Sequence, residues 1–189
     1  MANPAFDGAP VSLTFTHACV PIAVMVAVVR RPVSVRLMIV AVGAAMAPDL
    51  DALMHPLFGV ARASLYSHRG FSHSLFVAIA FGALAAACHR QLGVRALTAF
   101  VAVAAAMASH GLMDMMTDGG KPVAYLWPIT SLRFFADWRP LPGSGVQYPS
   151  HLAEVASRTG PEIAHVILPM MLIAISTRGC LLIIHSLRR

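Results

Sequence analysis

Residues 96–114, ALTAFVAVAAAMASHGLMD, join a long apolar run to a histidine and a carboxylate. His110 and Asp114 are four residues apart, so on a helix they project from one face about one turn apart. Such a pair can chelate a metal ion, or the aspartate can orient the imidazole. The alternative is a pair of ordinary hydrogen-bonding groups at a helix end. The stretch therefore predicts an apolar helix with a candidate metal-binding pair at its end.

Five apolar segments of this kind occur in the chain, at roughly 13–29, 37–54, 74–88, 96–110 and 163–187. The chain is 58% hydrophobic and 12% charged, whereas about a quarter of the residues in a soluble domain are charged. Several segments are shorter than the roughly 20 residues that cross a bilayer, so tilt or local thinning has to make up the difference. The composition predicts an all-α, polytopic membrane helix bundle with about four to five transmembrane segments.

We expect residues 1–189 to form a single membrane-embedded domain. Residues 111–162 are the one long polar stretch and are rich in proline and glycine. This stretch predicts a long irregular loop with a short helix around 150–158. Residues 163–187 predict the last apolar helix.

The basic residues predict the orientation of the segments. The net charge is +6, but no lysine or arginine run is present, so we expect no nucleic-acid partner. Arginines gather in alternate connections and at the C-terminus, and all eight acidic residues fall on the opposite side. Cytoplasmic loops carry the excess of positive charge, which predicts a cytoplasmic C-terminus and an extracytoplasmic N-terminus and polar loop. The arginines concerned are Arg30, Arg31, Arg36, Arg90, Arg95, Arg188 and Arg189.

Residue types that bind metals gather at the segment ends that share this outer side. A divalent ion needs several nitrogen and oxygen ligands that converge from separate elements. A tetrahedral ion binds four ligands, fewer than the seven candidates. Either two ions bind, or some of the residues hydrogen-bond to the ligands without contacting the metal. The candidates are His17, Asp49, Asp51, His68, His73, His110 and Asp114.

Several of these residues admit a second interpretation. Arg69, between two candidate ligands, either binds an anionic substrate group or pairs with an aspartate. Ser72 or Ser74 can cap the helix that follows. Asp51 is the candidate general base if it does not coordinate metal. His17 taken alone is better explained as a core histidine, but its position at the same membrane face as the other candidates makes a role at the site about as good an explanation.

The order of these motifs resembles the YdjM-like family of membrane-bound, metal-dependent hydrolases, described as LexA-binding inner-membrane hydrolases. The resemblance covers about residues 13–135, and no pattern carries over to 136–189. It implies a helical protein of the bacterial inner (plasma) membrane with a metal-dependent hydrolase site. The pattern is also similar, more distantly, to the helical zinc-dependent phospholipases C. The residues that carry it are Thr16-His17, Pro48-Asp49-Leu50-Asp51, His68-Arg69-Gly70-Phe71-Ser72-His73-Ser74, His110-Gly111-Leu112-Met113-Asp114, Thr117 and Leu126-Trp127-Pro128.

The functional expectation is a divalent-metal hydrolase at the outer membrane face. Zn²⁺ suits the histidines, and Mn²⁺ or Mg²⁺ suits the carboxylates. In this interpretation Asp51 is the base, Arg69 stabilises developing negative charge, and membrane lipid supplies lipid-like or phosphoester substrates. Two alternatives remain open: a non-catalytic protein in which the metal holds short helices together or shapes a partner-binding module, and an ion transporter.

Overall fold

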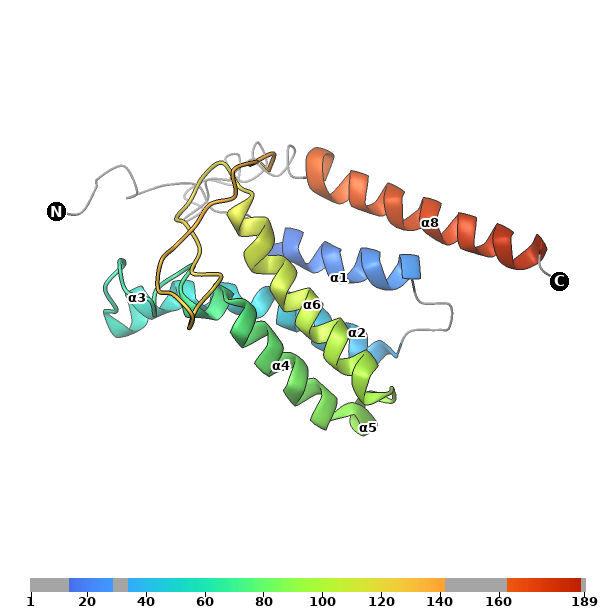
Figure 1. The fold of residues 1–189 in the computed structure, drawn as a ribbon, viewed down its shortest axis with the longest axis horizontal. Coiled ribbons are helices and arrows are strands. Elements are labelled where there is room, and N and C mark those ends of the chain that lie inside the picture. The colour runs from blue at the N-terminus through green and yellow to red at the C-terminus, as the bar shows by residue number, and fades with distance from the viewer. Residues whose placement is uncertain (1–13, 29–33, 142–162, 188–189) are drawn as a thin grey trace.

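The computed structural model describes residues 14–28, 34–141 and 163–187, which are mainly helical (Figure 1). No strand occurs in these ranges, only the isolated bridges Thr117–Leu141 and Val123–Phe134. Besides the α-helices, the structure contains two short 3₁₀ helices, Ala47–Leu53 and Phe71–His73, and a π-helical turn, Ile163–Ile167. The α-helices are α1 (Thr14–Val28), α2 (Val35–Met46), α3 (Met54–Phe58), α4 (Leu75–Ala87), α5 (His89–Leu92), α6 (Ala96–Met115) and α8 (Leu168–Leu187).

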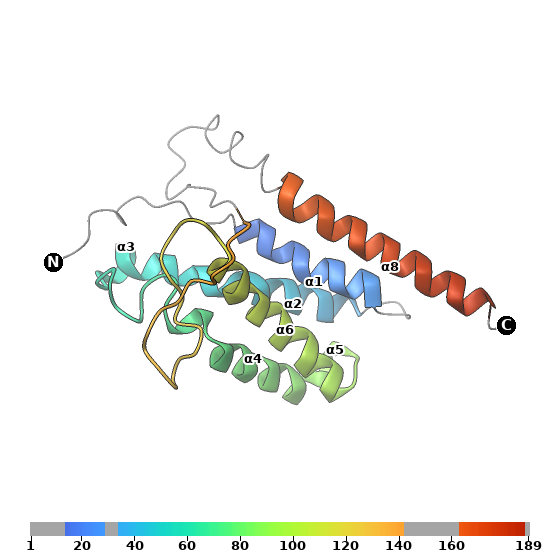
Figure 2. The same cartoon turned by 45° about the horizontal axis from the view of Figure 1, so that its top comes forward.

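Helix α6 lies at the centre of the bundle, in contact with α1, α2 and α4, while α8 packs on α1. Figures 1 and 2 show that α1 and α4 begin, and α2 and α6 end, at the same end of the bundle. This alternation is what an up-and-down chain path requires. The expectation that the candidate ligands lie at one end of the bundle is therefore confirmed for the backbone.

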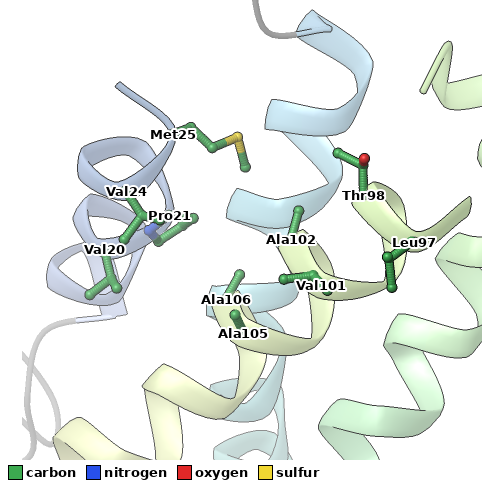
Figure 3. Close-up of a pocket in the computed structure, with 10 residues that line it drawn as sticks. All are labelled: Val20, Pro21, Val24, Met25, Leu97, Thr98, Val101, Ala102, Ala105 and Ala106. Carbon is green, nitrogen blue, oxygen red and sulfur yellow. The ribbon is translucent and has the colours of Figure 1, made fainter. Parts of the chain in front are cut away.

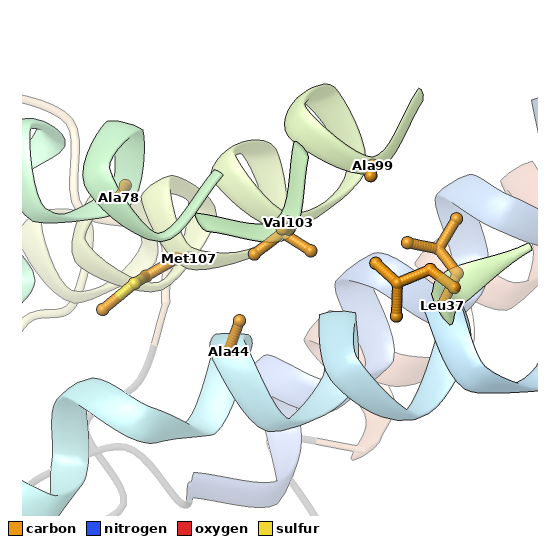
Figure 4. Close-up of a cluster of buried hydrophobic side chains, with 8 residues drawn as sticks. Leu37, Ala44, Ala78, Ala99, Val103 and Met107 are labelled. Carbon is orange, nitrogen blue, oxygen red and sulfur yellow. The ribbon is translucent and has the colours of Figure 1, made fainter. Parts of the chain in front are cut away.

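The core between α2, α4 and α6 is built mainly from small side chains, which lets the helices approach closely. Ala44 of α2, Ala78 of α4 and Val103 of α6 are buried in it, with Leu37 and Met107 filling the ends (Figure 4). Large apolar side chains such as Ile39 and Leu97 point outward instead and are mostly exposed. This inversion of the soluble pattern is what a lipid environment favours, because lipid tails are as apolar as leucine.

Hydrogen bonds at the opposite end of the bundle join the two described connections that carry arginine. Ser34 Oγ donates to the carbonyl of Leu92 at 2.6 Å, and an Nη of Arg36 donates to the carbonyl of Gln91 at 3.0 Å. The sequence prediction that these connections share one end is confirmed. Arg30, Arg31, Arg188 and Arg189 lie outside the described residues.

The observed helices follow the apolar segments with two differences. Helix α2 changes to a 3₁₀ helix at Ala47 because Pro48, at its start, has no backbone N–H. Helix α6 continues to Met115, so the irregular segment begins at Met116 rather than at residue 111. The short helix expected around 150–158 lies outside the described residues.

Two helical stretches are long and apolar enough to cross a membrane, Val35–Phe58 and Ala96–Met115. Thr16–Met25, Leu75–Ala87 and Leu168–Leu181 are apolar but shorter. The helical membrane architecture thus agrees with the sequence prediction, and the number of spans stays a prediction.

We predict that Gly82→Ala destabilises the bundle, because a Cβ there would lie 2.7 Å from the Cβ of Ala104 on α6. Overpacking of this kind costs about 1–3 kcal/mol of unfolding free energy. Gly43→Ala is the matched control, since nothing lies within 4 Å of its Cβ position. Thermal melts in detergent should show a lower unfolding temperature for Gly82→Ala alone. Equal melting of the two variants would contradict the close α4–α6 contact.

Candidate metal centre

The C-terminal end of α6 supplies two of the candidate ligands. His110 and Asp114 lie one turn apart, and both side chains are buried. The ring orientation of His110 is set from behind by Ala45, whose carbonyl oxygen lies 2.7 Å from Nδ1. A carbonyl only accepts hydrogen bonds, so Nδ1 carries the proton and Nε2 presents its lone pair.

The turn before α4 supplies His73. Ser74 caps α4 by accepting a hydrogen bond from the backbone N–H of Val77 at 3.3 Å, as one of the two serine interpretations predicted. The turn approaches α6 closely because residue 111 is glycine: a Cβ there would collide with the carbonyl oxygen of His73. This close approach brings the imidazoles of His73 and His110 together.

The 3₁₀ helix after α2 supplies two carboxylates that point to different sides of His73. A 3₁₀ helix turns once in three residues, so side chains two residues apart diverge. Asp49 Oδ1 lies 3.8 Å from Nε2 of His73, whereas Asp51 Oδ2 lies 3.1 Å from Nδ1. Only Asp49 joins the two histidines and Asp114 in one group, and Asp51 holds His73 from behind.

The central group consists of Asp49, His73, His110 and Asp114, with all four ligand atoms within 4.8 Å of one another. The two Nε2 atoms are 3.1 Å apart. Asp114 Oδ2 lies 3.3 Å from Nε2 of His73 and 3.5 Å from Nε2 of His110. Asp49 Oδ1 lies 3.3 Å from Nε2 of His110. Tetrahedral ligands at bond lengths of about 2.0–2.2 Å are roughly 3.3–3.6 Å apart, so the spacing fits a bound ion.

The protonation pattern gives a second reason for a cation at this point. With Nδ1 of each imidazole donating to Ala45 or Asp51, the two facing Nε2 atoms both present lone pairs in the neutral rings. Two lone pairs at this separation repel unless a positive charge lies between them. Asp114 Oδ2, which faces both nitrogens, is buried and has no hydrogen-bond partner. A metal ion satisfies all three atoms at once.

The carboxylates around His73 also favour a positive charge at the centre. Burial lowers the pKa of this imidazole, but the facing carboxylates of Asp114, Asp49 and Asp51 outweigh burial and hold its pKa well above the ordinary value of 6.5. The surroundings therefore favour positive charge, whether a proton or a metal ion supplies it.

A second group, Asp51, His68 and His73, adjoins the first. Nδ1 of His68 lies 2.9 Å from Asp51 Oδ1, and Ser72 Oγ donates to Asp51 Oδ2. The side chains of His68 and Asp49 are 19% and 14% exposed, whereas those of His73 and His110 are fully buried. Among the described residues, His68 and Asp49 thus form the partly exposed edge of the centre.

His17 lies beside the central group rather than within it. Its ring stacks on His110 with centroids 3.8 Å apart, and its Nε2 is 3.7 Å from Asp114 Oδ1. Both ring nitrogens are buried, and neither has a hydrogen-bond partner among the described residues. An ordinary core histidine normally satisfies at least one nitrogen, so this arrangement favours a role at the centre over a purely structural one.

Arg69 is completely buried behind Asp114. One Nη donates to Asp114 Oδ1 at 2.9 Å and to Thr117 Oγ at 3.2 Å. The other Nη donates to the carbonyls of Gly119 and Lys121. The aspartate pair is the second of the two roles that the sequence left open for Arg69.

Residues 116–141 cover the turn that carries His68 and His73. The backbone N–H of Ala124 donates to the carbonyl of Arg69 at 3.1 Å, and that of Leu75 donates to the carbonyl of Tyr125 at 3.0 Å. Arg133 donates to the carbonyl of His68. Among the described residues, this cover leaves the His68–Asp49 edge as the partly exposed side of the centre.

Two contacts of the site have no sequence signal, and the spacing of three further histidines on the predicted outer side, His55, His151 and His165, does not select them as ligands. The carbonyl of Ala45 and the bond from Ser72 to Asp51 have no sequence signal, because both depend on packing between distant segments. His55 bonds only within its own turn, to the carbonyl of Val60. The placement of His151 and of the His165 side chain lies outside what the structure describes.

Comparison with known proteins agrees with this arrangement. A family model described as YdjM inner membrane protein matches residues 13–186. The chain belongs to the YdjM inner membrane protein family. The match extends beyond residue 135, where the sequence motifs ended. The inner membrane protein YbcI of Escherichia coli (strain K12) is 35% identical over 125 residues, which is 66% of this chain and 72% of that protein. No solved structure matches the chain. The family and this relative support an inner-membrane location.

We predict that removal of any central ligand of this YdjM-family protein lowers its metal content. His73→Ala, His110→Ala and Asp114→Ala should each reduce the metal stoichiometry of detergent-purified protein, measured by elemental analysis, and lower its unfolding temperature. His55→Ala is the matched control, because this histidine contacts only its own turn. Full metal retention in the His73 and His110 variants would contradict the hypothesis that the central residues share one metal ion.

The raised pKa of His73 predicts opposite pH dependences for metal-free and metal-loaded protein. A protonated His73 stabilises the metal-free fold below the unfolded pKa of about 6.5, and this contribution is lost as pH rises through the higher folded pKa. Metal requires the neutral ring, so stabilisation by Zn²⁺ grows over the same range. Melting curves with chelator and with Zn²⁺ should therefore diverge as the pH rises above about 6.5. In the presence of chelator, His73→Asn should remove the decrease of unfolding temperature with rising pH. If the unfolding temperature of the wild type changes with pH in the same way with chelator and with Zn²⁺, the prediction is contradicted.

Proposed function

We propose that this YdjM-family protein is a membrane-bound, metal-dependent hydrolase. The observation that carries the proposal is the partly exposed edge, formed by His68 and Asp49, of an otherwise buried His/Asp centre. At that edge a further carboxylate–imidazole pair, Asp51 and His68, stands beside the ligand atoms although one ion does not need it. A centre that served only to hold helices together has no use for an accessible edge.

The proposed ligands are Asp49, His73, His110 and Asp114, with His17 adjacent. A divalent cation bound there would polarise the scissile bond and lower the pKa of a coordinated water. We favour Zn²⁺ because two ligands are imidazoles, with Mn²⁺ or Mg²⁺ as alternatives suited to the carboxylates.

Asp51 is the proposed general base, with His68 as its hydrogen-bond partner at the exposed edge. In hydrolysis of an ester or phosphoester, a water oxygen bonds to the carbon or phosphorus, and the alcohol leaves. The water proton passes to Asp51 and then to the alcohol. Asp51 also accepts from Nδ1 of His73, so its carboxylate links the base function to the orientation of a ligand.

Arg69 acts in this proposal as a positioning residue. Its side chain is 0% exposed, and both Nη groups already donate to protein atoms, so no face remains for a substrate. It fixes one oxygen of Asp114, and the other oxygen is thereby directed at the two histidines. This replaces the direct contact with substrate charge that the sequence first suggested.

A second candidate function is a metal-stabilised structural or partner-binding protein. It is favoured by the number of ligands, because four protein ligands saturate a tetrahedral structural ion. The two functions differ in whether water or substrate reaches the ion along the His68–Asp49 edge.

The proposed substrates are lipid-like phosphoesters or esters that reach the site from the membrane. The centre lies at the helix ends, opposite the end that carries Arg36, Arg90 and Arg95. By the positive-inside bias, the proposed orientation places the centre at the extracytoplasmic face and the C-terminus in the cytoplasm.

The test is hydrolysis of phospholipids and of bis(p-nitrophenyl) phosphate by the detergent-purified protein at saturating Zn²⁺ or Mn²⁺. Asp51→Asn should retain bound metal at saturation but lose activity by about 10²–10⁴-fold, the usual contribution of a general base. Asp137→Asn, an exposed carboxylate on the covering segment, is the control. Tightly bound metal that stabilises the fold, together with no hydrolysis of any substrate, would establish the structural alternative instead.

A further inference from the structure

An apolar groove of about 390 Å³ lies between α1 and α6. Val20, Pro21 and Val24 line it from α1, and Val101 and Ala105 are among the residues that line it from α6 (Figure 3). Thr98 is the single polar residue among the ten that form the wall. The groove extends from residue 97 to residue 106 of α6, about 14 Å at 1.5 Å per residue.

The groove leads directly to the metal centre. Val20, Pro21 and Val24 follow His17 by three, four and seven residues, which places them on the same face of α1. Ala106 precedes His110 by four residues on α6. One end of the groove is therefore about one helical turn, or 5.4 Å, from the stacked rings of His17 and His110.

The depth of the groove suits a lipid. The metal centre lies at the helix ends, where a membrane has its polar head groups, and the groove lies below it along α6, which is apolar and long enough to cross the membrane. Ala105 and Val101, which line the groove, and Val24 are exposed, so this side faces the bilayer. The neighbouring α8 covers α1 through Ala23, and none of the described elements covers the groove side, where Val24 is 51% exposed.

We propose that the groove binds one acyl chain of a membrane phospholipid and presents the polar end of that lipid to the metal centre. The role of the lipid as a substrate rests on the proposed hydrolase function, whereas the binding of its acyl chain in the groove does not. It assigns the substrate class as an acyl-chain phospholipid rather than a water-soluble phosphoester. The apolar wall excludes water from the chain, and the His17–His110 stack marks the point where the chain ends and the head group begins.

The binding test uses palmitoyl-oleoyl phosphatidylglycerol vesicles that contain a phospholipid with a photoreactive diazirine in its acyl chain. Adducts on the reconstituted full-length protein are mapped by peptide mass spectrometry. Wild-type protein should carry them at residues 20–25 and 97–106. Ala105→Trp and Val101→Trp fill the groove from exposed positions and should lower the yield there at least about tenfold, because each excluded methylene loses its burial. Ala83→Trp, at an exposed position of α4 outside the groove, should not.

The metal content of each variant shows whether it remains folded. If Ala105→Trp loses its metal, the result for Val101→Trp is used instead. Unchanged adducts in the blocked variants would overturn the proposal, as would adducts confined to the α2–α4 cavity around Val40 and Leu84. Protein–protein cross-links through the groove would assign it to a second copy and overturn it too.

Hydrolysis separates this proposal from the function on which it rests. If both hold, the blocked variants lose far more of their activity on long-chain phospholipid than on short-chain dihexanoyl phospholipid, because the short chain enters less of the groove. If the wild-type protein carries adducts in the groove but hydrolyses no lipid, the lipid-binding site is supported and the hydrolase function is rejected. Equal cleavage of long and short chains by the blocked variants would retain the hydrolase and reject the groove.

Discussion

The buried ion pair between Arg69 and Asp114 is the contact on which the rest of the metal centre depends. Arg69 has a left-handed backbone conformation with φ of 64°, and its two Nη groups connect Asp114 to Thr117 and to the carbonyls of Gly119 and Lys121. The same guanidinium thus fixes the end of α6, the beginning of the covering segment and one ligand. Breaking a buried ion pair of this kind leaves an uncompensated charge and is strongly destabilising.

Electrostatic balance explains why the centre favours a divalent cation. Asp49, Asp51 and Asp114 meet there, and Arg69 is the one guanidinium that forms an ion pair with them among the described residues. Neutral imidazoles add no charge, so negative charge is in excess in a region from which water is largely excluded. Such charge is costly unless it is paired or bound to metal. The contacts behind the ligands, Ala45 to His110 and Asp51 to His73, hold both Nε2 atoms toward the position that the cation would take.

The bundle separates polar from apolar chemistry along its axis. One end carries the connections with Arg36, Arg90 and Arg95, the other carries the His/Asp centre, and the length between them is built from small buried residues with large apolar side chains outside. This arrangement relates the α1–α6 groove to the metal centre, since both belong to the same helix faces at successive depths. In the proposed function, the metal centre at the polar boundary and the apolar groove beneath it match the two ends of a lipid molecule.

The sequence by itself determined the helices, their alternating direction and the set of residues that meet, because apolar length and segment order fix which helix ends lie together. It also determined that His110 and Asp114 share a face and that a serine caps α4. Only the tertiary structure decided that Asp49 rather than Asp51 joins the central group, since this depends on how the 3₁₀ helix that contains Pro48 orients its side chains. The pairing of Arg69 with Asp114 and the stack of His17 on His110 were likewise decided by contacts between distant segments. No local pattern specifies those contacts, because they arise only when the helices pack.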